Sequence, residues 1–596
     1  MSRRSSDLFR FVVGAGTAPR RAFAAFGIAL VQLCACAGQP RFPLRDPLWV
    51  DTDMRPVSVD CKRRPNKDDA EHISCAPDPY VSPLAWDGAD NLVFRPLANV
   101  FAVSPAREAV NVNALDEVPD SAWFTNRIGR THPSREELLR GACTPDEILK
   151  PEAAAPGSWV IDRGKTDGAS LGFRVRTPNG GKYMFKDDAP GQPERATAAS
   201  AVGAAIYHAV GYNTTCEQIA YFDRGLLHLN PGLTVTDNTG ITRPFDEKAL
   251  DRVLQEANRR GEQFRMQASA WLPGYLIGPF RYEGTRGDDP NDAIPHDERR
   301  DLRGGRVLAA WLNHFDAREQ NSMDSWFAAK DGPPDASPGF VRHYYIDTSD
   351  CFGSEWAWDS ISRRLGKSYL LDWGDLAFDF VTLGIPTRPW DRARRRPGFE
   401  LFGYFNVEDF DPEDWKNEYP NAAFSNATER DNAWMARILS RFERSELRDL
   451  VELGRFTQPE HAAYLAEVLE GRLQRILERY FARLSPIADL VVRGDQLCGT
   501  DLARRRDVWP GQRFHYAAIE HTSEGAVWVP VLPAAEGALC VNLTRWTRDP
   551  PRAGQPRYVT LTIRNGVSEY GLRVHLFDRG AGRGYQLLGI ERPEQP

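Results

Sequence analysis

The residues with the clearest chemical potential lie between His314 and Asn321, in the stretch HFDAREQN. An amphipathic helix is expected over 300–313 and a strand is expected afterwards, so this stretch should form the loop between them. Asp316 and Asn321 are five positions apart on that loop. In such an arrangement a carboxylate accepts the proton of an attacking hydroxyl, and an amide oxygen holds a metal ion. The stretch therefore indicates proton abstraction beside a bound cation.

A second metal-binding group is expected at Asp347. After Asn321 the sequence predicts a strand, a polar turn over 331–334 and a second apolar strand over 340–346. A hairpin returns its second strand to the end where the first began, so Asp347 should lie beside Asn321. We expect the two side chains to share a magnesium ion. Asp350 is the alternative, but Asp347 directly follows the apolar strand.

A glycine-rich segment, a lysine and a glutamate precede these residues. Gly168, Ser170 and Gly172 belong to the segment GASLG, which opens a predicted hairpin. Glycine lets backbone amides approach a phosphate group closely. The second strand of the hairpin ends at Lys186, and the alanine-rich helix that follows offers Glu194 near its start. The glycine segment therefore predicts a phosphate-binding loop.

The order of these elements resembles that of the protein kinases. A glycine loop, a strand lysine, a helix glutamate, an H-x-D-x4-N loop and a strand aspartate follow one another as in that fold. Thr348 and Ser349 stand where kinases have the Phe and Gly of D-F-G, and no A-P-E segment follows. The resemblance is therefore to the atypical branch, with the phosphoinositide kinases, spore-coat CotH kinases, toxin-type serine kinases and secreted casein kinases. It covers about residues 155–485.

The kinase resemblance implies a role for each of these residues. Asp316 would be the catalytic base, and Asn321 and Asp347 would be the metal ligands. Lys186 would bind the nucleotide phosphates and Glu194 would position it. The nucleotide-binding segment would contain Gly168, Ser170 and Gly172. In addition, the segments GTRGDDPND (284–292) and RVLAAWLNH (306–314) resemble a family of envelope lipoproteins of environmental bacteria.

The expected activity is magnesium-dependent transfer of a phosphoryl group from ATP or another nucleotide to an acceptor. The alternative is a catalytically inactive pseudokinase that needs no cofactor and binds an envelope protein or polysaccharide, since a fold does not imply an activity. A third interpretation is an unrelated α+β structural lipoprotein. In that case the lysine and glutamate form a surface ion pair, the glycine segment is a turn and Asp347 caps the next element.

The N-terminus has the pattern of an export signal. Arginines precede an apolar run over 22–37, which is long enough for a signal peptide but short for a membrane span. The run contains Leu33-Cys34-Ala35-Cys36, which resembles the bacterial lipobox. We expect residues 1–36 to be a signal peptide with a lipobox and Cys36 to be acylated; a plain cleaved signal is the alternative. The protein would then be anchored in the cell envelope, at the outer membrane, facing the periplasm or the exterior.

Charge and cysteine content limit the partners and the compartment. The 75 basic and 82 acidic residues give a net charge of −7, which excludes a global basic field and argues against a nucleic-acid partner. Export would place the chain in an oxidising compartment, where seven cysteines follow Cys36. Disulfides are expected between Cys61 and Cys75 and between Cys498 and Cys540. The odd number leaves at least one cysteine free.

These observations predict an α+β fold with several parts. Residues 37–85 are expected to be a linker, because they are rich in Pro, Asp and Arg without periodicity. A bilobal kinase-like body is expected over 86–490, with a β-hairpin-rich N-lobe to about 230 and a mainly helical C-lobe to about 490. Alternating strands then predict a C-terminal all-β domain, a small sandwich or barrel, over 500–596.

Overall fold

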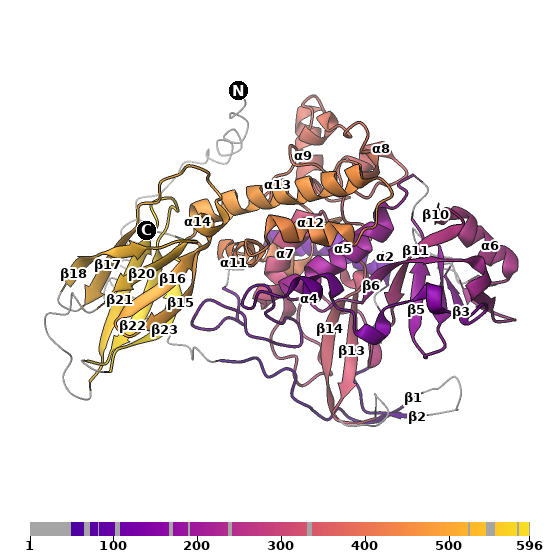
Figure 1. Ribbon diagram of the computed structural model, residues 1–596, viewed down its shortest axis with the longest axis horizontal. Coiled ribbons are helices and arrows are strands. Elements are labelled where there is room, and N and C mark those ends of the chain that lie inside the picture. The colour runs from indigo at the N-terminus through magenta and orange to yellow at the C-terminus, as the bar shows by residue number, and fades with distance from the viewer. Residues whose placement is uncertain are drawn as a thin grey trace, which may run out of the picture. The chain divides into compact units, whose positions relative to one another are not determined.

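The structure is a computed structural model, and the chain has a mixed α+β fold, as predicted (Figure 1). It describes residues 49–64, 72–81, 83–101, 108–165, 171–188, 191–236, 241–329, 336–522, 525–543, 555–580 and 583–594. All of these belong to one compact unit, Asp46–Pro596. The predictions for Cys36, Gly168, Ser170 and the turn over 331–334 fall outside the described residues.

The predicted hairpin from Gly172 to Lys186 is confirmed and lies within a seven-stranded sheet. Its strands, β4 (Gly172–Arg176) and β5 (Lys182–Lys186), pair antiparallel with Gly172 opposite Lys186. The strand order is β10-β11-β5-β4-β3-β7, and β6 also pairs with β11. Alternate apolar side chains such as Phe173 and Phe185 are buried, so one face of the hairpin forms core. The other strands are β3 (Trp159–Lys165), β6 (Glu217–Phe222), β7 (Leu227–Leu229), β10 (Asn258–Arg260) and β11 (Gln263–Ala270).

Helix α5 (Arg195–Val210) follows the hairpin and is buried along nearly its whole length. Its many alanines allow neighbouring backbone to approach closely. A Cβ added to Gly203 would lie 2.9 Å from Oγ1 of Thr348, so only a glycine permits this contact without a shift. The helix ends at Gly211, whose φ of 144° favours glycine. Helix α5 therefore packs directly on the segment that carries Asp347.

Four longer helices build the largest hydrophobic core. The apolar stripe predicted along the last of them is buried, including Leu465, Leu473 and Ile476. The indole nitrogen of Trp311 donates to the carbonyl of Leu469 at 2.8 Å and ties the first helix to the last. These helices are α7 (Arg300–Leu312), α11 (Glu429–Leu439), α12 (Arg444–Glu452) and α13 (Pro459–Arg483).

A three-stranded antiparallel sheet combines one strand that precedes α7 with two that follow it, and the latter two form the second predicted hairpin. Ser322 is opposite Tyr345 at one end of this hairpin, and Ala328 is opposite Gly339 at the other. The end of the second strand thus returns to the start of the first, as the sequence indicates. The strands are β12 (Tyr275–Gly278), β13 (Ser322–Ala328) and β14 (Gly339–Tyr345), in the order β12-β13-β14.

The chain after α13 is rich in strands, which gather at the C-terminal end of that helix (Figure 1). They form a sheet in the order β15-β16-β20-β19 and another in the order β18-β17-β21-β22-β23. Buried side chains such as Leu497, Leu561 and Val574 form a separate core cluster. The first strand begins at Ile487, earlier than the predicted boundary near 500, and a short helix, α14, interrupts the strands. The elements are β15 (Ile487–Arg493), β16 (Gln496–Asp501), α14 (Leu502–Arg506), β17 (Ala517–Thr522), β18 (Gly525–Val529), β19 (Val531–Pro533), β20 (Ala538–Asn542), β21 (Arg557–Arg564), β22 (Leu572–Asp578) and β23 (Tyr585–Glu591).

The described part of the segment expected to be a linker is packed against the rest of the chain. The predicted disulfide between Cys61 and Cys75 closes a small hairpin there. Val57 and Gly339 exchange two backbone hydrogen bonds, of 2.8 and 2.9 Å. This part is therefore held by a cross-link and by backbone pairing, and does not form an extended stalk. The strands of the hairpin are β1 (Lys62–Arg64) and β2 (His72–Ser74).

The cysteines of the described chain are mostly paired. The predicted disulfide between Cys498 and Cys540 is confirmed, and a further disulfide joins Cys143 to Cys216. The expected free cysteine is Cys351, which is buried. The remaining elements are α2 (Leu84–Ala89), the π-helix η2 (Asp90–Phe94), α3 (Arg95–Phe101), α4 (Arg135–Arg140), β8 (Thr234–Thr236), β9 (Thr242–Pro244), α6 (Glu247–Glu256), α8 (Asp359–Ser362), α9 (Trp373–Thr382), α10 (Ala422–Ser425) and the 3-10 helices η3 (Pro145–Glu147), η4 (Pro151–Ala153), η5 (Arg224–Leu226), η6 (His296–Glu298), η7 (Glu319–Asn321), η8 (Pro389–Arg392) and η9 (Glu400–Phe402).

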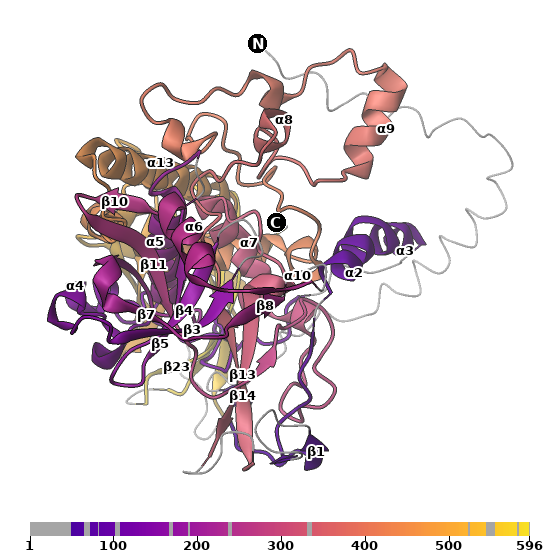
Figure 2. The same cartoon turned by 90° about the vertical axis from the view of Figure 1, so that its right-hand side faces the viewer.

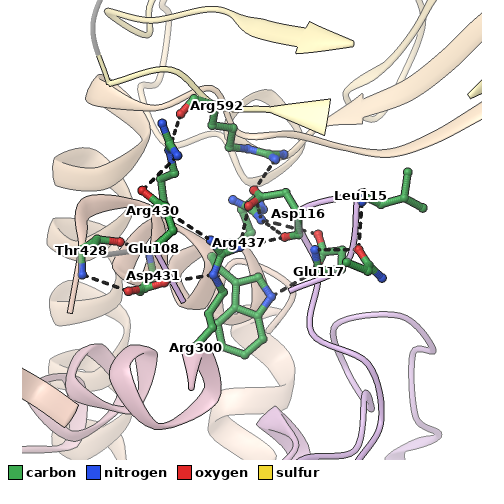
Figure 3. Close-up of polar contacts among 12 residues, drawn as sticks. Glu108, Leu115, Asp116, Glu117, Arg300, Thr428, Arg430, Asp431, Arg437 and Arg592 are labelled. Carbon is green, nitrogen blue, oxygen red and sulfur yellow. Dashed lines mark hydrogen bonds and ion pairs between the residues drawn. The ribbon is translucent and has the colours of Figure 1, made fainter. Parts of the chain in front are cut away.

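A buried carboxylate, Asp116, connects distant parts of the sequence (Figure 3). It accepts hydrogen bonds from Arg300 at 2.5 Å, from Arg437 at 3.1 Å and from Arg592 at 2.7 Å. Burial alone would raise the pKa of Asp116, but the three guanidinium charges hold that pKa well below its usual range. The arginines come from α7, from α11 and from the residue after β23, so this network joins the C-terminal segment to the helices.

Candidate functional site

Lys186 and Asp347 meet although 161 positions separate them in the sequence. Nζ of Lys186, the last residue of β5, donates to Oδ2 of Asp347 at 2.8 Å. Both side chains are largely buried, with 15% and 27% exposure. Burial by itself raises the pKa of Asp347, but the charge of Lys186 and its hydrogen bond hold that pKa well below the usual range. Asp347 is therefore an ionised carboxylate beside a protonated lysine.

The backbone around Asp347 is held from two sides. The amide of Ile346 donates to the carbonyl of Asn321 at 3.1 Å, which places Asp347 just beyond the paired ends of β13 and β14. On the other side, Oγ1 of Thr348 donates to the carbonyl of Ser200 on α5 at 3.3 Å. The amide of Ser349 donates to Oδ1 of Asp347 at 3.0 Å and orients the carboxylate.

Asp316 and Asn321 are in direct contact, as the loop spacing predicts. Helix α7 ends with Asn313 in the left-handed conformation, at a φ of 55°, and the chain turns into the loop there. Nδ2 of Asn321 donates to Oδ2 of Asp316 at 2.8 Å and to its backbone carbonyl at 2.7 Å. The two side chains thus fix each other, and Asn321 also contacts the backbone next to Asp347.

Asp350 and His314 connect the loop of Asp316 to helix α5. Oδ2 of Asp350 accepts a hydrogen bond from the amide of Asp316 at 2.9 Å, and Oδ1 lies 3.4 Å from Nε2 of His314. Nδ1 of His314 is hydrogen-bonded to the hydroxyl of Tyr207 on α5 at 2.7 Å. Burial raises the pKa of Asp350 to about 6, His314 opposes this shift, and the charges of Asp316 and Asp347 add to it. Asp350 is thus electrostatically coupled to both predicted site carboxylates.

The environment of Asp316 disfavours its charged form. Burial raises the pKa of Asp316 to about 8, although the guanidinium of Arg318 lies 2.6 Å from Oδ1 and opposes the shift. Glu418 adds to the shift and also accepts from Arg318 at 2.9 Å. Sequence reasoning missed both residues. Arg318 lies within the same loop motif and could have been found there, whereas Glu418 is about 100 positions away in the chain.

The predicted partnership of Lys186 with Glu194 is wrong. Glu194 precedes α5 with a φ of 69°, and its carboxylate accepts hydrogen bonds from the amide and the hydroxyl of Thr457. The other carboxylate that interacts electrostatically with Lys186 is Glu217, at the start of β6. Burial raises the pKa of Glu217, which accepts a hydrogen bond from Ser269 at 2.6 Å. Nothing in the local sequence distinguishes Glu217, because only the pairing of strands brings it near Lys186.

Gly172 has a structural reason to be glycine. A Cβ at this position would lie 2.2 Å from the carbonyl oxygen of Phe185, across the strand pair. The absence of a side chain thus allows β4 and β5 to pair at the position of Lys186. Gly168 and Ser170, the other predicted nucleotide-binding residues, lie outside the described part of the chain.

Asp347 and Asn321 are the residues that could hold a magnesium ion shared with a nucleotide. Mg²⁺ in phosphoryl-transfer sites uses one or two protein oxygen ligands together with phosphates and water. An ionised carboxylate at Asp347 and an amide at Asn321 supply ligands of that kind at neighbouring positions. Within the described residues there is no group of three or more His, Cys, Asp or Glu side chains that could hold a metal without a ligand from outside.

Comparison of the chain with family models, with curated proteins and with solved structures finds no match. In the described part of the chain, no helix has the length and apolar character needed to cross a membrane.

Proposed function

We propose that the protein is an exported, lipid-anchored, kinase-like phosphotransferase that uses magnesium and ATP or another nucleotide. The observation that carries the proposal is the junction of two pairs, Lys186 with Asp347 and Asp316 with Asn321, at the shared end of β13 and β14. A cation, a metal-binding carboxylate, a base and an amide are the groups that phosphoryl transfer needs in one place.

In this proposal each residue has a separate task. Lys186 binds phosphate oxygens of the nucleotide, with Glu217 in place of Glu194 as the nearby acid. Asp347 and Asn321 would hold magnesium, which would neutralise charge on the transferred phosphoryl group. Asp316 accepts the proton of the acceptor hydroxyl. A carboxylate with a pKa near 8 is well matched to this work at neutral pH, since a base is most effective when its pKa is close to the ambient pH.

The proposed bilobal arrangement assigns the seven-stranded sheet and α5 to an N-lobe and helices α7 to α13 to a C-lobe. In support, the sheet has its own core cluster, which is separate from the core of the helices. The buried side chains of α5, such as Val202 and Ile206, belong to the core of the helices, so α5 is the element that joins the two lobes. Lys186 comes from the sheet, whereas Asp316 and Asn321 follow α7, so the site residues derive from both groups of elements. The strands from β15 to β23, with a third core cluster, are the proposed C-terminal all-β domain.

Attachment to the cell envelope rests on the sequence around Cys36. The three disulfides support an oxidising compartment, because such bonds persist there and are rare in reducing cytosol. Radiolabelled palmitate should be incorporated into the chain and lost in Cys36→Ser. Equal labelling of the two proteins would contradict the anchor at that residue.

Nucleotide titration by calorimetry tests the enzyme directly. We expect heat of ATP binding that depends on magnesium, and we expect Asp347→Asn to abolish that dependence because it removes the metal-binding charge. Asp316→Asn should still bind the nucleotide but should not transfer phosphate to an acceptor, since it lacks the base. The matched control is Asp162→Asn, a carboxylate on β3 that pairs with Arg174 at 2.7 Å outside the site.

Two results would count against the enzyme. Calorimetric traces without heat of binding, for the folded wild-type chain with ATP and with other nucleotides, would contradict the proposed phosphotransferase activity. Equal magnesium dependence in wild type, Asp347→Asn and Asp162→Asn would contradict the proposed metal site. Thermal unfolding of each variant establishes that the proteins compared are folded.

An inactive binding module is the second candidate, and a separate observation favours it. A cavity of about 500 Å³ lies beside Asn313 and has Trp390, Tyr404 and Trp415 together with several charged side chains in its wall. Aromatic faces next to charged and polar groups suit a sugar chain. If nucleotides do not bind, an envelope polysaccharide should bind here, and Trp390→Ala should weaken that binding. A polysaccharide affinity equal in wild type and Trp390→Ala would contradict this module.

A further inference from the structure

Helix α9 presents an apolar stripe that the chain does not bury. None of its ten residues, all of them described, is buried. Trp373, Leu376 and Phe380 recur at intervals of four residues or fewer and share one face of the helix. Phe380 is 84% exposed, and Leu383 and Ile385, just past the helix, are 84% and 80% exposed. A helix in water normally turns such a stripe toward the core, so this one is expected to meet something outside the chain.

A second apolar group lies next to this helix. The indole nitrogen of Trp373 donates to the carbonyl of Leu92 at 2.8 Å, which connects α9 to the segment from α2 to α3. That segment exposes Trp86, Phe94 and Leu97, each more than half exposed. Both groups lie at the right-hand side of the view in Figure 2. Tryptophan is enriched where protein meets the boundary between lipid headgroups and acyl chains.

The charged residues next to α9 indicate what kind of partner covers its apolar stripe. The nine residues of 388–396 contain five arginines. Arg388 pairs with Asp375 and Asp379, and Arg395 pairs with Glu355 and Asp359, which leaves three arginines without an acidic partner among the ion pairs of the described residues. Arg392 and Arg394 are exposed and donate to neutral oxygens, those of Thr387 and Ala393, at 3.1 Å. Their charges therefore remain available to phosphate groups. Basic side chains beside an exposed apolar helix are typical of binding to an anionic membrane surface, whereas a second copy would place like charges together.

We propose that residues 373–396, the α9 surface, bind directly to an anionic lipid bilayer. Trp373, Phe380 and Leu383 enter the boundary between headgroups and acyl chains, and the arginines that follow contact the lipid phosphates. This contact is additional to any acyl chain at Cys36. It would hold the body of the protein against the membrane, where an acyl anchor alone would leave it free to turn.

A fluorophore placed on α9 reports whether this helix itself enters a bilayer, whatever attaches the rest of the chain to the membrane. Phe380→Cys is labelled with an environment-sensitive dye in the full chain with Cys34→Ser and Cys36→Ser, so the N-terminal thiols neither react nor carry lipid. Vesicles of phosphatidylcholine with one quarter phosphatidylglycerol should shift the emission to the blue. Replacing Arg392, Arg394 and Arg396 by Ser should raise the lipid concentration at half-maximal shift by at least about tenfold.

The matched control is the same dye at Trp528→Cys on β18, which is 64% exposed and lies outside the α9 surface. We expect no shift at this position, because it does not enter the bilayer. An unchanged dye at position 380 would overturn the proposal, and so would equal shifts on neutral and anionic vesicles. A blue-shifted dye without vesicles, together with a dimer in sedimentation, would also overturn it and would assign the α9 surface to a second copy.

Discussion

At the scale of single residues, the site holds neighbouring carboxylates in opposite protonation states. Lys186 keeps Asp347 ionised, whereas burial favours the protonated form of Asp316 despite the nearby Arg318. This difference follows from which cation each carboxylate meets and at what depth. A metal ligand must be ionised, whereas a base whose pKa lies near the ambient pH can both take up and release a proton, so the arrangement gives the two residues different chemistry.

The ion pair of Lys186 and Asp347 should contribute measurably to stability. Either Lys186→Met or Asp347→Asn leaves the other group largely buried without its partner, so each variant should unfold at lower urea concentration. The double variant should lose less than the sum of the two, with a coupling free energy of about 2 kcal/mol. Urea unfolding of all four proteins measures this. Additive losses would mean that the two groups do not interact in solution.

The raised pKa of Asp316 predicts the sign of a pH dependence. The folded chain keeps this proton up to about pH 8, whereas the unfolded chain releases it near the ordinary aspartate pKa of 3.8. The free energy of unfolding therefore falls as the pH rises between these values, because the folded state binds more protons. In Asp316→Asn the fall between about pH 5 and 8 should be smaller by about 3–4 kcal/mol. Parallel curves for the two proteins would place the pKa of Asp316 in its ordinary range.

At the scale of elements, α5 determines where the segment after β14 lies. Gly203 brings the helix backbone against Thr348, next to Asp347, and Tyr207 one turn later holds His314. One buried helix therefore contacts both the segment of Asp347 and the loop of Asp316. The absence of a side chain at Gly203 allows the first approach, whereas the long side chain of Tyr207 makes the second contact.

Replacing Gly203 by alanine tests the close approach of α5. A helical glycine changed to alanine normally gains up to about 1 kcal/mol. At Gly203 the new Cβ would lie 2.9 Å from Thr348, so Gly203→Ala should instead lower the free energy of unfolding by about 1–2 kcal/mol. The control is Gly88→Ala in α2, where no atom lies within 4 Å of the added carbon. Equal gains in both variants, by thermal unfolding, would contradict the contact.

At the scale of the whole molecule, Asp116 connects residues from widely separated parts of the chain. Its three arginine partners are buried and lie on α7, on α11 and just after β23 (Figure 3). Burial of so many like charges is tolerated because carboxylates lie among them. Asp116 pairs with all three arginines, Asp431 also pairs with Arg300 at 3.0 Å, and Glu117 lies 3.5 Å from Arg437. Arg592, the residue after β23, is thus attached to the helices through the side chain of Asp116.

Removal of this carboxylate should destabilise the fold strongly. Asp116→Ala leaves Arg300, Arg437 and Arg592 without their common partner, and we expect a loss of about 3–5 kcal/mol in the free energy of unfolding. Asp489→Ala is the control, since Asp489 is an exposed acid that pairs with Arg441 at 2.8 Å and should cost less than about 1 kcal/mol. Calorimetric unfolding measures both. Similar losses in the two variants would mean that the network does not stabilise the fold.

Local pattern was sufficient for several parts of the fold and the site. The hairpin at Gly172 and Lys186, the long apolar stripe of α13 and the contact of Asp316 with Asn321 follow from periodicity, turn residues or short spacing. The meeting of Asn321 with the segment of Asp347 followed from the same reasoning, since a hairpin returns to its origin. The disulfide Cys61–Cys75 flanks the short hairpin of β1 and β2, and Cys498–Cys540 joins the paired strands β16 and β20 of the C-terminal region.

Other features depended on contacts between distant segments. The partner of Lys186 could not be read from the neighbouring Glu194, because a left-handed residue before α5 directs that carboxylate to Thr457. Glu217 and Glu418 approach the site only through strand pairing and chain packing. The segment before residue 85 has a linker-like composition, yet backbone pairing of Val57 with Gly339 holds part of it.

By itself, then, the sequence determined the elements and the chemical groups they carry, because spacing along a helix, a strand or a turn is a local property of the chain. The tertiary structure alone decided which charges became partners and which surfaces stayed exposed. Burial and electrostatic interaction depend on distance in space, and residues such as Lys186 and Asp347, or Asp116 and Arg592, become neighbours only when the whole chain has folded.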